Sequence, residues 1–285
     1  MTTATVDPAC LQRAATDGTL ELLYQPEIDL DSGAIVAMEG LLRWHHRDLG
    51  VLGPADFLDL AISSGQISPI GEWVLRTGAA EAASWRDLRA PVRQLWLNVS
   101  TAQLRAPGFP ELVAAVVAEH GLTPGCLGLE LTERTVLELG AEAAPRLRAL
   151  RAAGVSLAVD DFTSFYATLG AIEALPIDAI KLGHRYVRGV GDAGHDDALV
   201  ISVLARAHAR GLYVVAEGVE TWSEQARLTE LGCDRAHGWL FASAQRADKS
   251  RWLLAQGSGW RGGVVSPDLR ALPFPVQRPA TAEAL

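Results

Sequence analysis

Cysteine is scarce in this 285-residue chain, and long apolar runs are missing. The three cysteines, Cys10, Cys126 and Cys233, are widely spaced and odd in number, so they predict neither a disulfide framework nor a zinc site. We interpret them as buried or half-buried thiols in a reducing compartment. No run approaches the roughly 18 apolar residues of a membrane span, and we expect no secretory signal at the N-terminus. These absences predict a soluble, cytoplasmic protein with no membrane partner.

Positive charge is also in short supply. The formal net charge is −9, and lysine occurs only at Lys181 and Lys249. A surface that coats DNA or RNA needs an excess of basic residues, so we expect no nucleic-acid partner. A small anionic ligand is compatible with this composition where metal ions or local arginines neutralise it.

The length and composition fit one large α/β domain. Hydrophobic residues make up 49% of the chain, which is enough to fill the core of a barrel of this length. We expect an N-terminal segment at 1–19, a globular domain at 20–258 and a loosely ordered C-terminal tail, rich in Pro and Ala, at 259–285.

Short β-like runs alternate with helical patterns along the globular part. Two such runs between residues 20 and 44 flank the turn signal "DLDSG" and predict an opening antiparallel hairpin. Further strands are predicted at 95–100, 127–133, 156–162, 178–183, 212–220 and 235–241. Helices are predicted at 8–19, 54–64, 70–88, 110–120, 141–153, 167–174, 195–210, 222–231 and 247–256. Strands that alternate with helices favour a parallel sheet. A barrel fits eight strands better than an open sheet, although the pattern alone leaves both possible.

Polar side chains end most of these apolar runs. They are Glu39, Asn98, Glu130, Asp160, Asp161, Lys181 and Glu217. The carboxyl ends of parallel barrel strands meet at one mouth, so we expect these side chains to converge. Carboxylate and amide oxygens are ligands for Mg²⁺, Mn²⁺ or Ca²⁺, and a neighbouring Asp pair suits two ions. Any one of these acids alone is more often a solvated loop charge; their repetition at strand ends argues for a site.

Lys181 stands out among these groups because the others are acids or an amide. A lysine in that setting can orient the attacking water or stabilise charge on a phosphate. The alternative is an ion pair that offsets excess negative charge in the mouth. The pair Asp160–Asp161 follows the apolar run "LAV", where unpaired charges are costly, so cations are expected beside them.

The segment "EGLLRW" resembles the EAL domain family of cyclic di-GMP phosphodiesterases. The resemblance spans about residues 20 to 256 and also includes, in the family's order, "YQPEIDL", "LNVS", "ELTE", "VDDF", "IKLG", "VVAEGVET" and "GCDRAHGWLFA". It implies a TIM-type (β/α)8 barrel with an antiparallel first strand. It also implies hydrolysis of cyclic di-GMP to linear pGpG with two Mg²⁺ or Mn²⁺ ions, for which Ca²⁺ is inhibitory.

The resemblance assigns roles to individual residues. Its metal ligands fall on Glu39, Asn98, Glu130, Asp160, Asp161 and Glu217, and its catalytic groups on Lys181, Glu39 and Glu217. Arg43, Gln25 and His237 are assigned to substrate binding, while Glu133 and Glu220 support the loop after the paired aspartates. Each of these three assignments has an alternative. Arg43 could be a surface arginine, Gln25 could serve structural packing, and His237 could be a metal ligand.

The chain departs from the family's pattern at several places, among them the acidic pair that usually follows Ala61, which is absent here. Gly40 replaces the alanine of the name-giving motif, a change worth roughly 0.5–1 kcal/mol of backbone rigidity. Thr163 and Phe165 replace two loop glycines, and both residue types resist the dihedrals that glycine permits. His237 stands where the family usually has Gln. These changes leave a second interpretation open: a weak or inactive cyclic di-GMP receptor, or a protein-interaction module.

By resemblance we also expect a homodimer through residues 162–170 or a separate regulatory protein.

Overall fold

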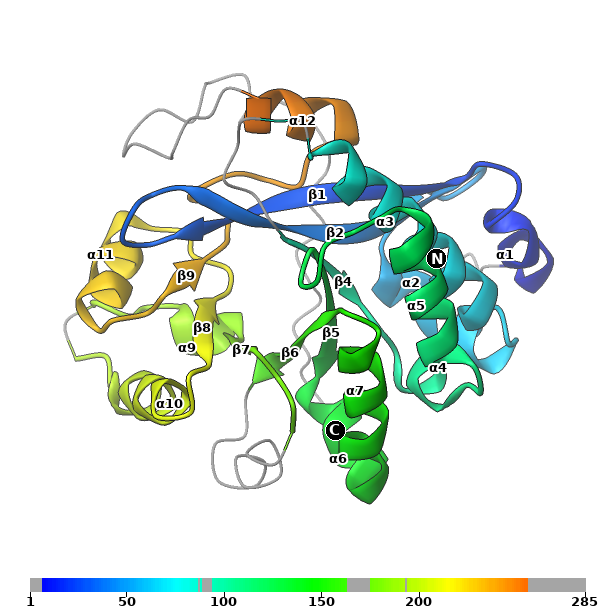
Figure 1. Cartoon of the computed structure of the whole chain (residues 1–285). Coiled ribbons are helices and arrows are strands. Elements are labelled where there is room, and N and C mark those ends of the chain that lie inside the picture. The colour runs from blue at the N-terminus through cyan, green and yellow to red at the C-terminus, as the bar shows by residue number, and fades with distance from the viewer. Residues whose placement is uncertain (1–6, 87, 89–93, 163–174, 193, 256–285) are drawn as a thin grey trace.

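A closed ring of strands forms the centre of the molecule (Figure 1). The computed structural model describes residues 7–86, 88, 94–162, 175–192 and 194–255. Strand β1 (Leu20–Asp29) pairs with both β2 (Ile35–His46) and β9 (Arg235–Ala236), and these two pairings close the ring. Both pairings of β1 are antiparallel.

The remaining strands of the ring run parallel to one another. From β2 the order continues through β4 (Gln94–Asn98), β5 (Leu127–Thr132), β6 (Ser156–Phe162), β7 (Ala179–Leu182) and β8 (Tyr213–Ala216) to β9. The short strand β3 (Gly50–Leu52) adds an antiparallel extension to the outer end of β2. The prediction of a TIM-type (β/α)8 barrel with an antiparallel first strand is confirmed.

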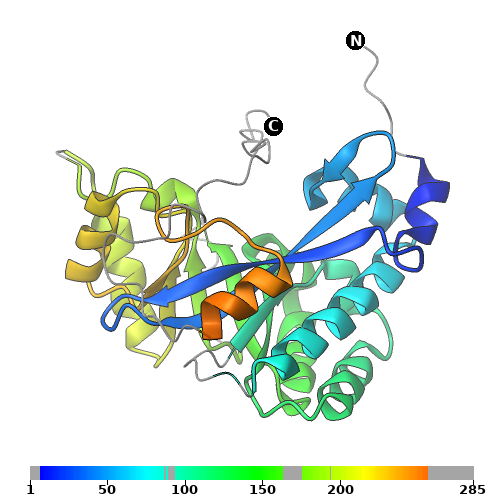
Figure 2. The ribbon, with the colours of Figure 1, turned by 90° about the horizontal axis from the view of Figure 1, so that it is seen from above.

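Helices surround the ring (Figure 1). In chain order they are α3 (Ile67–Ser84), α4 (Thr101–Arg105), α5 (Phe109–Glu119), α6 (Glu133–Leu139), the 3-10 turn η1 (Gly140–Glu142), α7 (Ala143–Ala152), α9 (His184–Val187), α10 (Ala198–His208), α11 (Trp222–Glu230) and α12 (Ala247–Ala255). Helix α12 lies along the outside of β1, as Figure 2 shows. Within the described residues, none of the helices combines the length and apolar character needed to span a membrane.

The β1–β2 hairpin extends past the ring and builds a second, smaller core, which we call the outer cluster. Helices α1 (Pro8–Ala14) and α2 (Pro54–Ser63) pack there with β3 (Figure 2). The outer cluster consists of Leu11, Ala14, Leu20, Trp44, Leu52, Phe57, Ala61, Ile67 and Ile70. Trp44 meets Phe57 edge-on, with ring centroids 5.4 Å apart. This cluster joins the N-terminal helix to the outer end of the hairpin.

Several predicted boundaries differ from the observed ones. The strand predicted at 235–241 ends at Ala236, and the helix predicted at 8–19 ends at Ala14. The helical pattern at 141–153 forms only the later part of a segment that begins with α6. The helix predicted at 167–174, the loop residues Thr163 and Phe165, and the tail at 259–285 lie outside the described residues.

A leucine side chain explains the glycine at position 40. A Cβ on Gly40 would lie 2.7 Å from Cδ2 of Leu97, and one on Gly78 would lie 2.7 Å from Cδ1 of the same residue. Leu97 is 1% exposed, so it fills the space between β2 and α3 that these two glycines leave open. Gly40 therefore leaves room for the side chain of Leu97.

Candidate active site at the carboxyl ends of the strands

Successive strands deliver polar side chains to one end of the ring. Glu39 lies in β2, Asn98 ends β4, Glu130 lies in β5, Lys181 lies in β7, and Glu217 directly follows β8. Strands β2 to β8 are parallel, so their carboxyl ends point the same way and these groups converge. The predicted convergence is present in the structure.

Lys181 lies at the centre of this group. Its side chain is fully buried, and its ammonium contacts a carboxylate oxygen of Glu130. The ammonium is also 3.5 Å from Oε2 of Glu39 and 3.9 Å from Oε1 of Glu217. Burial alone would favour the neutral amine, but these carboxylates outweigh burial and raise the pKa of Lys181 well above its usual value. The lysine is therefore charged at neutral pH.

The three carboxylates around the ammonium differ in their surroundings. Burial raises the pKa of Glu130 and of Glu217 above the usual value, against the opposing effect of Lys181. Burial acts on Glu39 as well, but Lys181, His237 and Asn98 outweigh it and lower its pKa. The amide of Asn98 donates to Oε1 of Glu39 at 3.1 Å.

His237 joins the group from the segment after β9. The backbone N–H of His237 donates to the carbonyl of Ala216 at 3.0 Å, and its own carbonyl accepts from the N–H of Val219 at 3.0 Å. The next residue, Gly238, approaches so closely that a Cβ there would lie 2.2 Å from the carbonyl oxygen of Val219. This close approach holds the imidazole beside Glu217.

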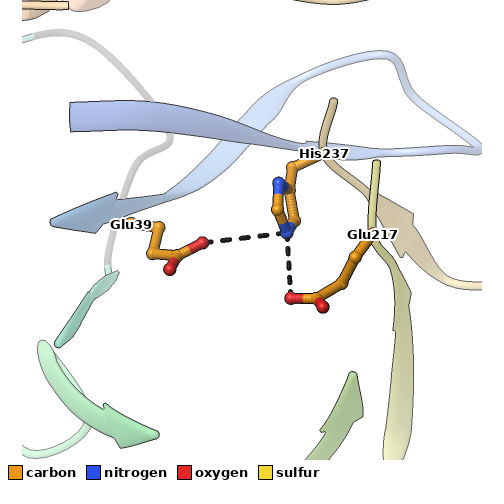
Figure 3. A group of neighbouring side chains, drawn as sticks. All are labelled: Glu39, Glu217 and His237. Carbon is orange, nitrogen blue, oxygen red and sulfur yellow. Dashed lines mark hydrogen bonds and ion pairs between the residues drawn. The ribbon is translucent and has the colours of Figure 1, made fainter. Parts of the chain in front are cut away.

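The imidazole of His237 points between two carboxylates (Figure 3). Its Nε2 is 3.1 Å from Oε1 of Glu217 and 3.7 Å from Oε2 of Glu39. One ligand atom from each of the three residues lies within 4.8 Å of the others, a spacing that suits a metal ion. Burial lowers the pKa of His237, although Glu39 opposes it. The neutral imidazole that results is the form that binds metal ions.

The two neighbouring aspartates lie within a β-bulge of β6. Val159 pairs with Ile180 and Phe162 pairs with Leu182, so β6 carries one more residue than β7 across this interval. Asp161 adopts a left-handed backbone with φ 47°, which Asp tolerates better than most residues. The negative charge of Asp160, and a hydrogen bond between the two side chains, add to burial in raising the pKa of Glu217, so Asp160 belongs to the same group.

Asp161 is placed differently from Asp160. Its side chain is exposed, its backbone N–H donates to Oδ1 of Asp160 at 2.7 Å, and burial and Asp160 raise its pKa. Arg185 lowers the pKa of Asp161, whereas buried Glu133, at the start of α6, raises it. Arg185 was not predicted from the sequence, where its only signal is its position just after the strand that carries Lys181.

The predicted substrate contacts lie around this group. Gln25 faces Glu39 across the β1–β2 pair, and its amide donates to the carbonyl of Ala242 at 3.0 Å. Arg43 lies four residues after Glu39 on β2 and therefore on the same face of the strand. Burial lowers the pKa of Arg43, and the charge of Glu39 opposes this. Glu220 is exposed, and its backbone N–H donates to Glu224.

An open groove of about 860 Å³ lies elsewhere, on the outer face of β1 between α3 and α12. Tyr24, Trp73, Glu81, Arg246 and Arg251 are among the residues that line it. None of the residues at the carboxyl ends of the strands lines this groove, so it adds nothing to the candidate site.

The donor set fits divalent cations. Three carboxylates face one ammonium, so an excess of negative charge is left within a buried space when they are ionised. A bound cation would neutralise this excess, and carboxylate oxygens are suitable ligands for it. The residues present therefore match the metal requirement that the sequence predicts.

Known proteins are similar to this chain over most of its length. The family model of the EAL domain matches residues 9–244. An uncharacterized protein of Azorhizobium caulinodans is 36% identical over 233 residues, which cover 80% of this chain. The chain spans only 32% of that relative's length.

Solved structures match over the same part of the chain. The phosphodiesterase PaMucR in complex with c-di-GMP has a TM-score of 0.79 and 32% identity, covering 85% of this chain and 98% of that one. The EAL domain of Mycobacterium smegmatis DcpA has a TM-score of 0.70 and 34% identity, with the same coverage of 85% and 98%.

Proposed function

The chain belongs to the EAL domain family, and on that premise we propose that it hydrolyses cyclic di-GMP to linear pGpG. The observation that carries the proposal is the meeting of buried Lys181 with the carboxylates of Glu39, Glu130 and Glu217 at the carboxyl end of the barrel. The two divalent ions, Mg²⁺ or Mn²⁺, would be held by Glu39, Asn98, Glu130, Asp160, Asp161 and Glu217. The likeness to PaMucR, which is described in complex with c-di-GMP, supports this choice of substrate.

Arg43 is the proposed anchor for the dinucleotide. A guanidinium pairs with phosphate oxygens through two parallel hydrogen bonds. Its Cα lies roughly 13 Å from that of Glu39 along β2, since a strand rises about 3.3 Å per residue. A ligand that reaches from Arg43 to the carboxylates would thus be held at both ends. Gln25 acts indirectly in this proposal, because its amide already holds the segment that follows His237.

In the proposed reaction, a water oxygen bonds to one phosphorus and the bond between that phosphorus and the 3′ oxygen breaks. The released 3′ oxygen takes up a proton, which leaves a linear product with a 5′ phosphate. Lys181, charged because of its carboxylate neighbours, stabilises negative charge that develops on the phosphate. Glu39 and Glu217 orient the attacking water and accept its proton. The bound ions supply Lewis acidity and make coordinated water more acidic.

The direct test is incubation of the purified protein with cyclic di-GMP and either Mg²⁺ or Mn²⁺, followed by chromatography for pGpG. We expect pGpG with either ion, none in the presence of a chelator, and inhibition by Ca²⁺, which prefers a larger and more flexible coordination shell. Glu39→Gln should abolish turnover. Glu72→Gln, which alters an exposed ion pair with Arg76, is the matched control and should leave turnover unchanged. Full activity of Glu39→Gln would refute the assignment.

His237 favours a second candidate function, that of a receptor which binds cyclic di-GMP and turns it over slowly. The imidazole lies against Glu39 and Glu217, two of the groups on which turnover depends in this proposal. Calorimetry in the presence of Ca²⁺ would then show binding of the dinucleotide, while the Mg²⁺ reaction yields no pGpG. Absence of both binding and turnover would instead indicate a protein-interaction module.

The expected homodimer has its own test. Analytical ultracentrifugation at several protein concentrations would show whether the sedimenting mass is that of one chain or of two.

A further inference from the structure

We propose that His237 is a ligand of the ion held between Glu39 and Glu217, and that its imidazole makes this position prefer a first-row transition metal to Mg²⁺. The inference rests on the metal site of the proposed function and specifies which class of ion that site selects. In this proposal the imidazole supplies a nitrogen ligand beside the carboxylate oxygens of Glu39 and Glu217.

The spacing of the three ligand atoms supports this role. Two ligands at right angles around an ion, with bonds of about 2.1 Å, are about 3.0 Å apart. Nε2 of His237 is 3.1 Å from Oε1 of Glu217 and 3.7 Å from Oε2 of Glu39. Small side-chain shifts would therefore place all three atoms around one ion (Figure 3).

The backbone around His237 keeps the imidazole in this position. Hydrogen bonds to Ala216 and from Val219 fix the residue on both sides, and Ala216 directly precedes Glu217. The imidazole and the carboxylate are thus attached to the same pair of hydrogen-bonded segments. A ligand that is held in place before the ion arrives loses little conformational entropy on binding.

The second ring nitrogen, Nδ1, can carry the proton when Nε2 binds an ion. Nδ1 of His237 is buried and has no hydrogen-bond partner among the described residues. Without an ion, an Nε2–H can donate to Oε1 of Glu217 at 3.1 Å, and a bound ion would take the place of that proton. A proton on Nδ1 leaves the lone pair of Nε2 directed between the two carboxylates.

The chemistry of imidazole determines the preference. Carboxylates and water suit Mg²⁺, Ca²⁺ and Mn²⁺, whereas imidazole suits Zn²⁺, Fe²⁺, Ni²⁺ and Cu²⁺. One nitrogen in an oxygen site therefore raises the affinity for the later transition metals and contributes little to Mg²⁺. The amide of glutamine offers an oxygen at about the same place, so His237→Gln removes the nitrogen donor and keeps a polar side chain.

Pulsed electron paramagnetic resonance on the Mn²⁺-loaded protein tests the ligation directly. We expect a coupling from an imidazole nitrogen that changes when the histidines are labelled with ¹⁵N and disappears in His237→Gln. His208→Gln is the matched control and should retain the coupling, because His208 pairs with Asp234, which also accepts from the N–H of Val214 near the start of β8, at the opposite end of that strand from Glu217. Wild-type protein without a nitrogen coupling would overturn the proposal, and that measurement needs no folded variant.

Binding constants test the selectivity. In His237→Gln we expect the dissociation constant for Co²⁺ to rise by about tenfold or more, since loss of even an outer partner of a ligand costs that much. The constant for Mg²⁺ should change by less than about threefold. Equal weakening of both ions would overturn the preference. If the wild type shows the nitrogen coupling but makes no pGpG, the proposed function is refuted and the ligation by His237 is supported. If the wild type makes pGpG without the coupling, the proposed function is supported and the ligation by His237 is refuted.

Discussion

Lys181 is one of two lysines in the chain, and its fully buried ammonium is surrounded by carboxylates. Removing one partner from a buried ion pair leaves the other charge uncompensated, which costs about 3–5 kcal/mol. We therefore expect Lys181→Met to lose about that much free energy of unfolding in the presence of a chelator, measured by urea denaturation.

Divalent ions should partly reverse this loss, because a cation can replace the ammonium among the carboxylates. We expect Mg²⁺ to stabilise Lys181→Met more than it stabilises the wild type. Lys249→Met, at the other lysine, is the control and should differ little from the wild type. A Lys181→Met protein as stable as the wild type without metal would contradict the charge balance described here.

Cys233 gives a prediction about pH. Burial raises the pKa of its thiol to about 12, against about 8.5 in an unfolded chain. The unfolded chain therefore loses this proton first, and the free energy of unfolding should decrease as the pH rises from about 8.5 towards 12. Urea denaturation between about pH 8 and about pH 10 should show this slope. Cys233→Ala should have a shallower slope, whereas Cys10→Ala should keep it.

Single residues also show where prediction from the sequence ends. The acids and Lys181 follow apolar runs, so their meeting could be predicted from strand order alone. The bulge at Asp160 and Asp161 could not, because it depends on how β6 pairs with β7. Nor could the neighbours of His237, since they result from two loops that are far apart in sequence but hydrogen-bonded to each other. Its assignment to substrate binding stays a prediction.

Between elements, the contact of β2, β4 and α3 gives a packing prediction. Gly40→Ala restores the alanine that is usual in the family, but its methyl group would press on Leu97. Overpacking a filled core typically costs about 1–3 kcal/mol. We expect Gly40→Ala to be destabilised by that amount in urea denaturation. The double variant Gly40→Ala with Leu97→Val should be less destabilised than the sum of the two single changes; strict additivity would count against this packing explanation.

The sequence predicted the elements of the barrel better than their ends. Eight strands with alternating helices were visible because each has a distinct apolar period. Short pieces such as β3, α4 and α9 were missed, since they contain too few residues to show any period. Strand β9 is shorter than predicted because the chain turns at Gly238 towards Val219, a close approach that an apolar run does not reveal.

For the whole molecule, metal binding should appear as added stability. An ion that binds the folded chain alone raises the free energy of unfolding by about 2.7 kcal/mol at a hundred times its dissociation constant. We expect the melting temperature to rise with the logarithm of the Mn²⁺ concentration and to fall when a chelator is added. Glu217→Gln should reduce the rise, and sodium chloride at equal ionic strength should not reproduce it. A melting temperature independent of Mn²⁺ would contradict the metal site.

At this scale the closed ring was predictable, whereas the outer cluster was not. The number of strands and the opening hairpin indicated a barrel with an antiparallel first strand. The second core arises because β1 and β2 continue past the ring and meet α1 and α2, and only the observed length of their pairing shows this.

One strand thus belongs to both cores. β2 carries Glu39 within the ring and Trp44 within the outer cluster, with Arg43 just before the tryptophan. A neighbouring molecule that tilted α1 and α2 would also move the outer part of β2. Because Glu39 and Arg43 lie on the same strand, both residues would shift with it.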